Sequence, residues 1–225
     1  MPLDDFRNTI ASNDIIAELR TGLIGEGMKF KTPFGNQTLT YADYTASGRA
    51  LSQVENFVAE QVLPFYANSH TTASFCGAHM TQMRQQARQI IADLTNAGPD
   101  CSVIFTGSGA TSAINRLVAL SGINNRDHTV RPTILIGPYE HHSNILPWRE
   151  SGAKVIEIDE ADNGGPDLAM LEQELQSCKP GSLIIGSFSI ASNVTGIVTD
   201  ADAVTRLLKQ YGALAFWDYA GGGPY

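Results

Sequence analysis

The sequence predicts an α/β protein built on a mostly parallel sheet with helices on both faces. After Asp100, short apolar and β-branched runs alternate with amphipathic stretches of helical length. Strands and helices that alternate in this way form parallel sheets through right-handed crossovers. The most informative residue is Asp218, because it ends an apolar run at residues 213–217. Ligands of open α/β sheets bind at the carboxyl ends of strands, so Asp218 marks a candidate site.

The elements of this sheet follow from the periodicity of the apolar residues. Strands are predicted at residues 102–106, 133–137, 153–158, 182–188 and 213–217, and helices near residues 110–121, 144–151, 167–177 and 200–211. Asp167 and Asp200 are suited to cap the last two helices, because a short acidic side chain accepts the free N–H groups of a first turn. Gly212 suits the position after the last helix.

The first hundred residues show a different, mainly helical pattern. A helix is predicted at residues 10–23, a short strand or extended segment at 39–44, and two further helices at 51–66 and 80–94. The last of these carries apolar residues on one face, which predicts core packing rather than a cofactor contact. Residues 1–40 are accordingly assigned to an N-terminal helical segment and residues 41–225 to a larger domain.

Composition narrows the class of protein. The chain has 225 residues, a hydrophobic content of 43% and a net charge of −8. These values favour a globular protein and count against nucleic acid or an anionic membrane as partner. The N-terminus lacks a signal-peptide pattern, and three distant cysteines without CxxC spacing indicate neither disulfides nor zinc. We expect a cytoplasmic protein without a metal site.

A glycine-containing turn follows the first predicted strand. Gly109, Ala110 and Thr111 lie directly before or within the next helix, where free N–H groups and a hydroxyl suit a phosphate. The alternative is a tight strand-to-helix turn without a ligand. The segment is not a dinucleotide fingerprint, because Ser112 stands where the third glycine of GxGxxG would be.

Two further polar clusters follow predicted strands. His141, in the segment Glu140–Asn144, is suited to stack on a planar ligand, act as a base or bind a metal; a structural role in capping the next helix is the alternative. Asn193 lies in the segment Ala191–Gly196 and offers an amide hydrogen bond, or supports an Asx turn with Gly196 at positive φ.

Asp218 completes the set of candidate residues. A buried carboxylate needs a cationic or hydrogen-bonding partner, which an arginine or a helix N-terminus could also supply. Together, however, a phosphate cradle, a stacking ring, an amide and a carboxylate match the groups of pyridoxal 5'-phosphate. The carboxylate keeps the pyridinium nitrogen of that cofactor protonated.

In these segments the sequence resembles the class V aminotransferase and cysteine desulfurase family of fold-type I pyridoxal-phosphate enzymes. The resemblance runs in order through nearly the whole chain, in segments 41–47, 105–111, 114–115, 140–148, 192–196 and 217–220. It implies that residues 41–225 form the cofactor-binding large domain. It also implies that Ala110 and Thr111 hold phosphate, His141 stacks on the ring, Asn193 reaches the phenolic oxygen and Asp218 pairs with the ring nitrogen. Asp218 and His141 are therefore the expected catalytic residues.

Two departures from the family pattern qualify this resemblance. The segment Gly107-Ser108-Gly109 has one glycine more than usual, so the phosphate contacts can shift by a residue. Gly221 stands where desulfurases commonly have a glutamine, which counts against a desulfurase in particular.

The family's Schiff-base lysine follows the aspartate, whereas all five lysines of this chain precede Asp218. We therefore expect an N-terminal fragment, truncated before that lysine and inactive alone, of an enzyme that acts on an amino acid by transamination, elimination or desulfuration. The full-length protein is expected to be a homodimer. The strand at residues 102–106 would then lack a neighbour on one side. The alternatives are a lysine-less relative that binds the cofactor or a partner without turnover, and a nicotinamide-dependent Rossmann enzyme.

Overall fold

A computed structural model describes residues 2–124 and 129–223 of the chain. It divides into two compact units, Met1–Ile104 and Phe105–Tyr225. We describe each unit by itself. Every residue assigned to the candidate site belongs to the second unit.

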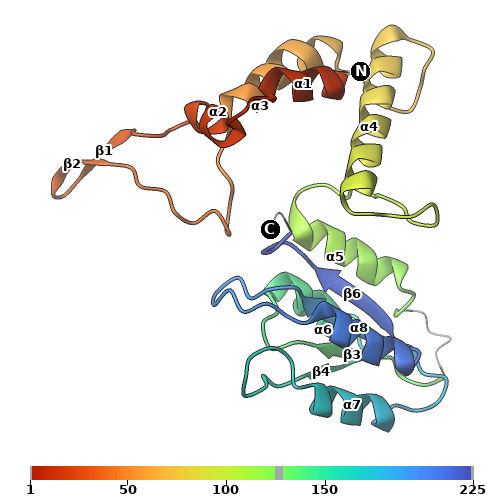
Figure 1. The fold of residues 1–225 in the computed structure, drawn as a ribbon. Helices are drawn as coiled ribbons and strands as arrows, with labels where there is room; N and C mark the ends of the chain where they lie inside the picture. The colour runs from red at the N-terminus through yellow and green to blue at the C-terminus, as the bar shows by residue number, and fades with distance from the viewer. Residues whose placement is uncertain (1, 125–128, 224–225) are drawn as a thin grey trace. The chain divides into compact units, whose positions relative to one another are not determined.

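The second unit contains a four-stranded, fully parallel sheet (Figure 1). Its strands are β3 (Thr133–Ile136), β4 (Lys154–Glu157), β5 (Ile184–Ser189) and β6 (Leu214–Asp218), in the spatial order β4-β3-β5-β6. Four of the predicted strands are thus confirmed, each within two residues at either end. The predicted α/β fold with a parallel sheet is confirmed.

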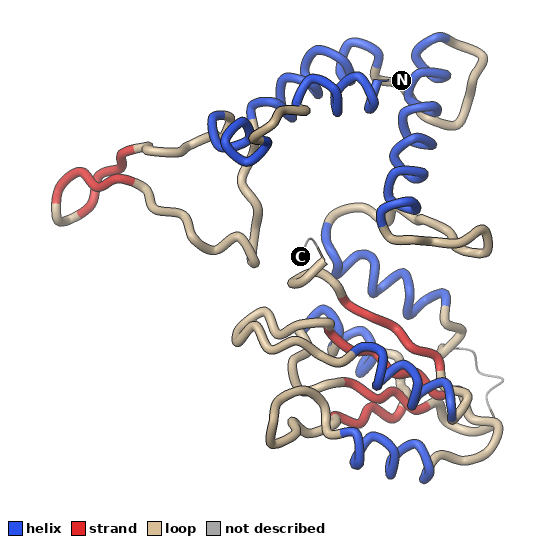
Figure 2. Tube along the Cα trace, in the orientation of Figure 1, coloured by secondary structure: helices blue, strands red, loops and turns tan. Residues whose placement is uncertain are grey.

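Helices precede and connect these strands at the places that the sequence predicts (Figure 2). They are α5 (Gly109–Leu120), the short 3-10 turn η3 (His142–Asn144), α6 (Leu146–Glu150), α7 (Leu168–Ser177) and α8 (Ala201–Gln210). Asp167 accepts hydrogen bonds from two amides in the first turn of α7, and Asp200 accepts one from Ala203. Both predicted caps are confirmed. Gly212 ends α8 with φ +71°, as predicted.

Two hydrophobic clusters cover the two faces of the sheet. On one face α5 and α6 contribute Ile114, Val118 and Trp148, which pack against alternate residues of β3 and β5. On the other face α7 and α8 contribute Leu171, Leu175, Val204 and Leu208 to a cluster with Phe188. Because side chains alternate along a strand, Ile134 and Leu135 belong to opposite clusters. The prediction of helices on both faces is confirmed.

The predicted strand at residues 102–106 is wrong. This segment is irregular, with Ile104 and Phe105 exposed. A β-strand needs a neighbour to satisfy its backbone N–H and C=O groups, and no described strand pairs with it. Apolar residues alone therefore did not produce a strand here.

The first unit departs further from the sequence prediction. Its helices are α1 (Pro2–Ile10), α2 (Ile15–Thr21), α3 (Ser52–Phe57) and α4 (Phe75–Leu94). A short π-helix, η1 (Val58–Val62), and a short 3-10 helix, η2 (Leu63–Phe65), follow α3. The helix predicted at residues 10–23 is shorter than expected, because α2 begins only after Asp14, which caps it by accepting from Ala17. The helix α1 before it was not predicted. No strand forms at residues 39–44 in the described chain.

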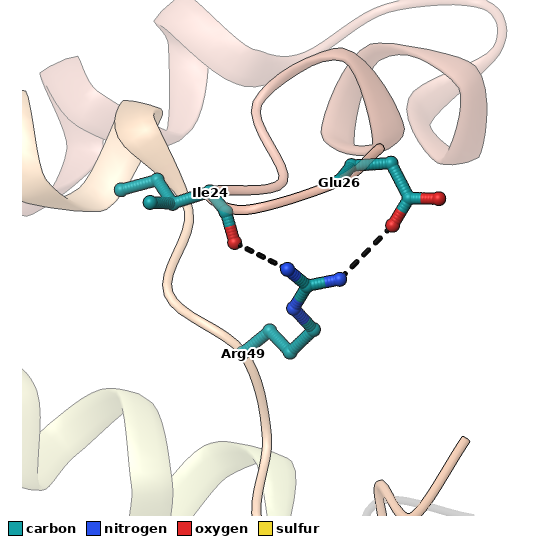
Figure 3. Close-up of polar contacts among 3 residues, drawn as sticks. All are labelled: Ile24, Glu26 and Arg49. Carbon is teal, nitrogen blue, oxygen red and sulfur yellow. Dashed lines mark hydrogen bonds and ion pairs between the residues drawn. The ribbon is translucent and has the colours of Figure 1, made fainter. Parts of the chain in front are cut away.

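The first unit also contains a hairpin that was not predicted. Strand β1 (Lys29–Thr32) pairs antiparallel with β2 (Gly35–Thr38), although seven of these eight residues are exposed. The segment after the hairpin is fastened by Arg49. Its guanidinium donates to the Ile24 carbonyl at 2.7 Å and to Glu26 at 3.0 Å (Figure 3). The local periodicity of apolar residues does not predict such long-range polar contacts.

Candidate functional site at the carboxyl edge of the sheet

Asp218 is the last residue of β6 and lies partly buried at the carboxyl edge of the sheet. Its register partner on β5 is Ser189. One oxygen of the carboxylate, Oδ1, accepts a hydrogen bond of 2.8 Å from the Ala220 amide. No ion pair joins Asp218 to another described residue. The carboxylate therefore has capacity for a further hydrogen-bond donor.

A second carboxylate, Glu140, lies beside this strand end. Its Oε1 accepts from the Ser189 amide at 2.7 Å, and its Oε2 accepts from the Ser189 hydroxyl at 2.8 Å. Asn144 donates a third hydrogen bond to Oε2 at 2.5 Å. Burial raises the pKa of Glu140, and the negative charge of Asp218 raises it further, against the opposing effect of these hydrogen bonds.

The Glu140 contacts continue into a buried polar network beneath the edge. The Asn144 amide oxygen accepts from the Trp148 indole at 3.1 Å and from the Ser187 hydroxyl at 2.7 Å. Trp148 is completely buried and also donates to Ser187 at 3.1 Å. Buried polar groups of this kind are stable because they satisfy one another. The network links the loop after β3 to the end of β5.

His141 follows Glu140 and is exposed at the same edge. Its Nδ1 accepts a hydrogen bond of 3.2 Å from the Ser143 amide, so His141 caps the η3 turn. This is the structural role that the sequence left open as an alternative. Because Nδ1 accepts, the neutral ring carries its proton on Nε2. The cap fixes one edge of the ring and does not exclude stacking on its face.

Asn193 is exposed in the loop after β5. The Ser192 hydroxyl accepts from the amides of Val194 and Thr195, so Ser192 rather than Asn193 supports the turn. Gly196 has φ +75°, as the turn reading expected. A side-chain carbon at Gly221 would lie 3.8 Å from Asn193 Cβ. Asn193 therefore lies beside the segment that leaves Asp218, with its amide free of the role in the turn.

The predicted phosphate cradle is the start of α5. Gly107 and Gly109 have φ values of +108° and +73°, which only glycine adopts readily. Ser108 precedes the helix without capping it through its side chain. Thr111 is exposed, and a side-chain carbon at Gly109 would meet nothing within 4 Å. Uncapped amides next to open space suit an anion at a helix N-terminus.

The lysines of the second unit lie at the amino ends of the strands, opposite the candidate site. Lys154 begins β4, Lys179 precedes β5, and Lys209 stands near the end of α8, before β6. Lys154 and Lys179 line a pocket of about 300 Å³ together with Thr133, the first residue of β3. In a parallel sheet the amino ends of all strands share one edge, so these amines lie away from Asp218.

The donor set at the carboxyl edge fits pyridoxal phosphate. The uncapped start of α5 suits the phosphate group, and the exposed His141 ring suits the face of a planar ring. The Asn193 amide can donate to an oxygen of the cofactor, and the Asp218 carboxylate can accept from a protonated ring nitrogen. A metal is a poorer fit, because no described group of three His, Cys, Asp or Glu side chains converges to bind one. Helices of membrane-spanning length and hydropathy are likewise absent from the described residues.

The fold and this edge define an α/β protein with a candidate ligand site at the carboxyl ends of its parallel strands. The aminotransferase class-V family matches residues 40–223, and the chain belongs to that family. Enzymes of this family depend on pyridoxal phosphate. The family membership predicted from the ordered motifs is thereby confirmed.

Several relatives are named cysteine desulfurases. A probable cysteine desulfurase of Pyrococcus abyssi is 30% identical over 190 residues, covering 82% of this chain and 44% of that protein. One of Chlamydia muridarum is 33% identical over 178 residues, covering 74% of this chain and 42% of the other. The chain thus spans less than half the length of these relatives.

Solved structures of cysteine desulfurases have a fold similar to that of this chain. The apo cysteine desulfurase of Thermococcus onnurineus superposes with a TM-score of 0.64 at 25% identity, over 77% of this chain and 42% of that one. The cysteine desulfurase CsdA of Escherichia coli gives 0.63 at 25% identity, over 80% and 44%. The fold is therefore similar to part of the cysteine desulfurase fold.

Sequence reasoning missed the part that Glu140 plays. Glu140 belongs to the motif that contains His141, but nothing in that motif indicates its contact with Ser189 or the network to Trp148. The signal was an acidic residue directly before His141, at the end of a buried strand. Its partner lies 49 residues away, so the strand register was needed to find it.

Proposed function

We propose that the chain forms the cofactor-binding part of a pyridoxal-phosphate enzyme that acts on an amino acid, with cysteine desulfuration as the reaction its relatives favour. The observation that carries the proposal is the joining of His141 and Asp218 at one sheet edge, through Glu140 and Ser189. When bound, the cofactor supplies an electron-accepting ring that stabilises negative charge on the substrate α-carbon.

Each residue of the edge has a distinct part in this proposal. Asp218 would accept a hydrogen bond from the protonated ring nitrogen, and its negative charge would keep that nitrogen cationic. His141 covers one face of the ring, while Asn193 donates to the phenolic oxygen. The amides at the start of α5 and the Thr111 hydroxyl hold the phosphate.

A second function is favoured by the lysine positions. Because Lys154, Lys179 and Lys209 lie at the amino edge, the second unit offers no amine beside Asp218 among its described residues. The second unit is accordingly proposed to hold the cofactor without a covalent bond to one of its own lysines. It would then act as a binding protein rather than a complete catalyst.

The experiment that tests the proposal is titration of the chain with pyridoxine 5′-phosphate. This ligand has the ring and the phosphate but no aldehyde, so it does not react with surface lysines. We expect saturable binding, and we expect Asp218→Ala to weaken it about tenfold or more by leaving the ring nitrogen without its carboxylate. Asp202→Asn, at an exposed acid on α8, is the matched control and should bind like the wild type. Equal binding by Asp218→Ala would contradict the role of Asp218.

A further inference from the structure

We propose that Glu140 is a positioning residue of this site. It fastens the loop that carries His141 to Ser189, the strand neighbour of Asp218, and so fixes the separation of the two ring-binding side chains. The inference rests on the proposed function, since it concerns how that site keeps its geometry. It assigns a role to a carboxylate that does not itself touch the ring in the proposal.

The loop that carries His141 is closed at its base. Glu140 precedes His141 and Asn144 follows it at three residues, and these two side chains hydrogen-bond each other at 2.5 Å. The backbone N–H of Asn144 also donates to the His141 carbonyl at 2.7 Å. His141 therefore lies within a short loop whose two ends are held together.

This closed loop is hydrogen-bonded to the end of β5. Ser189 donates to both oxygens of Glu140, once through its amide and once through its hydroxyl. Two hydrogen bonds to one carboxyl group restrict its orientation as well as its distance. The position of the loop is thereby tied to the strand end.

Ser189, which binds the loop, is also the strand neighbour of Asp218. Ser189 pairs with Asp218 in the β5–β6 register, and the next amide, Ile190, donates to the Asp218 carbonyl at 3.0 Å. Adjacent strands lie about 4.8 Å apart, so a displacement of Ser189 reaches Asp218 directly. Glu140 is thus the link between His141 and Asp218.

The backbone around Glu140 is adapted to this contact. A side-chain carbon at Gly137 would lie 2.9 Å from Glu140 Oε1 and 2.9 Å from Phe188 Cδ1. Contacts that short require something to move, and Phe188 is fully buried. The missing side chain at Gly137 leaves the room that the Glu140 carboxylate occupies.

The test combines ligand binding with hydrogen exchange on the 225-residue chain. Pyridoxine 5′-phosphate is titrated into the wild type, Glu140→Ala, Glu140→Gln and Ser189→Ala, with Glu150→Gln, at an exposed acid on α6, as the control. We expect Glu140→Ala to weaken binding about tenfold. Glu140→Gln keeps the length and an acceptor oxygen for the Ser189 amide but turns an NH2 group towards the Asn144 side-chain amide, so it should weaken binding less than Glu140→Ala does. The near-ultraviolet band of the bound ligand, which reports the protonation of its ring, should shift in Glu140→Ala and shift less in Glu140→Gln.

Tryptophan fluorescence shows which variants are folded, because both tryptophans, Trp148 and Trp217, lie in the second unit. If Glu140→Ala does not fold, Ser189→Ala, which removes only the hydroxyl hydrogen bond to Glu140, is compared with the wild type instead. A folded Glu140→Ala that binds with wild-type affinity and an unshifted band would overturn the inference. If the wild type itself fails to bind, the proposed function is wrong; amide exchange at Ser189 and Asn144 then decides about Glu140, and unchanged protection in Glu140→Ala overturns its role.

Discussion

At the scale of single residues, the site depends on two carboxylates with different surroundings. Asp218 keeps hydrogen-bonding capacity towards the open edge, whereas Glu140 accepts three hydrogen bonds from Ser189 and Asn144. Burial and the nearby Asp218 charge both raise the pKa of Glu140. The two neighbouring carboxyl groups thus differ in role: Asp218 is available to a ligand, whereas Glu140 binds other residues of the protein.

The raised pKa of Glu140 predicts a pH-dependent stability. The folded state holds the Glu140 proton more tightly than the unfolded state, in which the pKa is about 4.3. Its contribution is therefore fully present below that value and is lost as pH rises through the folded pKa. In Glu140→Gln this loss cannot occur, so the free energy of unfolding relative to the wild type should shift in favour of the variant as pH rises.

Urea unfolding followed by tryptophan fluorescence, at a series of pH values from the ordinary glutamate pKa upward, measures this difference. Glu150→Gln, which removes one exposed charge from α6, is the control. Parallel stability curves for the wild type and Glu140→Gln over the whole series would disprove the assignment of a raised pKa.

At the scale of elements, the strands and helices of the second unit are placed by close packing. Gly186 on β5 faces α8, where a side-chain carbon would overlap Leu208 and lie 3.0 Å from Phe188. Leu208 is fully buried and cannot move aside freely. The separation of β5 and α8 thus depends on a residue without a side chain.

Gly186→Ala should therefore destabilise the second unit by about 1–3 kcal/mol, the usual cost of overpacking a core. Gly221→Ala is the matched control, because its added carbon would make contacts of 3.8 Å or more, which are ordinary. Both variants are compared by urea unfolding with tryptophan fluorescence. A Gly186→Ala variant as stable as the control would show that the β5–α8 contact adapts without cost.

At the scale of the whole molecule, the two units differ in their cores. Both hydrophobic clusters lie in the second unit. Among the described residues of the first unit, Met83 is the buried hydrophobic side chain, while Ile16, Phe34 and Leu94 are exposed. Burial of apolar surface is the main source of folding stability, so the first unit gains much less stability from a hydrophobic core than the second.

Hydrogen exchange should show this difference. We expect amides of β3 and β5 to exchange only through opening of the whole second unit, and amides of α1 to α4 to exchange much faster. The measurement is residue-resolved exchange on the 225-residue chain. Equal protection of α4 and β5 would show that the first unit is stabilised by contacts other than a hydrophobic core.

The sequence by itself determined the α/β class, four strands, the caps at Asp167 and Asp200, and the family, because these depend on local patterns and ordered motifs. Tertiary structure decided the rest. Residues 102–106 have the composition of a strand but no partner, and the β1–β2 hairpin forms from exposed residues. Glu140 acquires its role only when the register brings Ser189 to it, 49 residues along the chain. Periodicity reports which face of an element is apolar, whereas hydrogen-bond partners distant in sequence are fixed only once the strands are aligned.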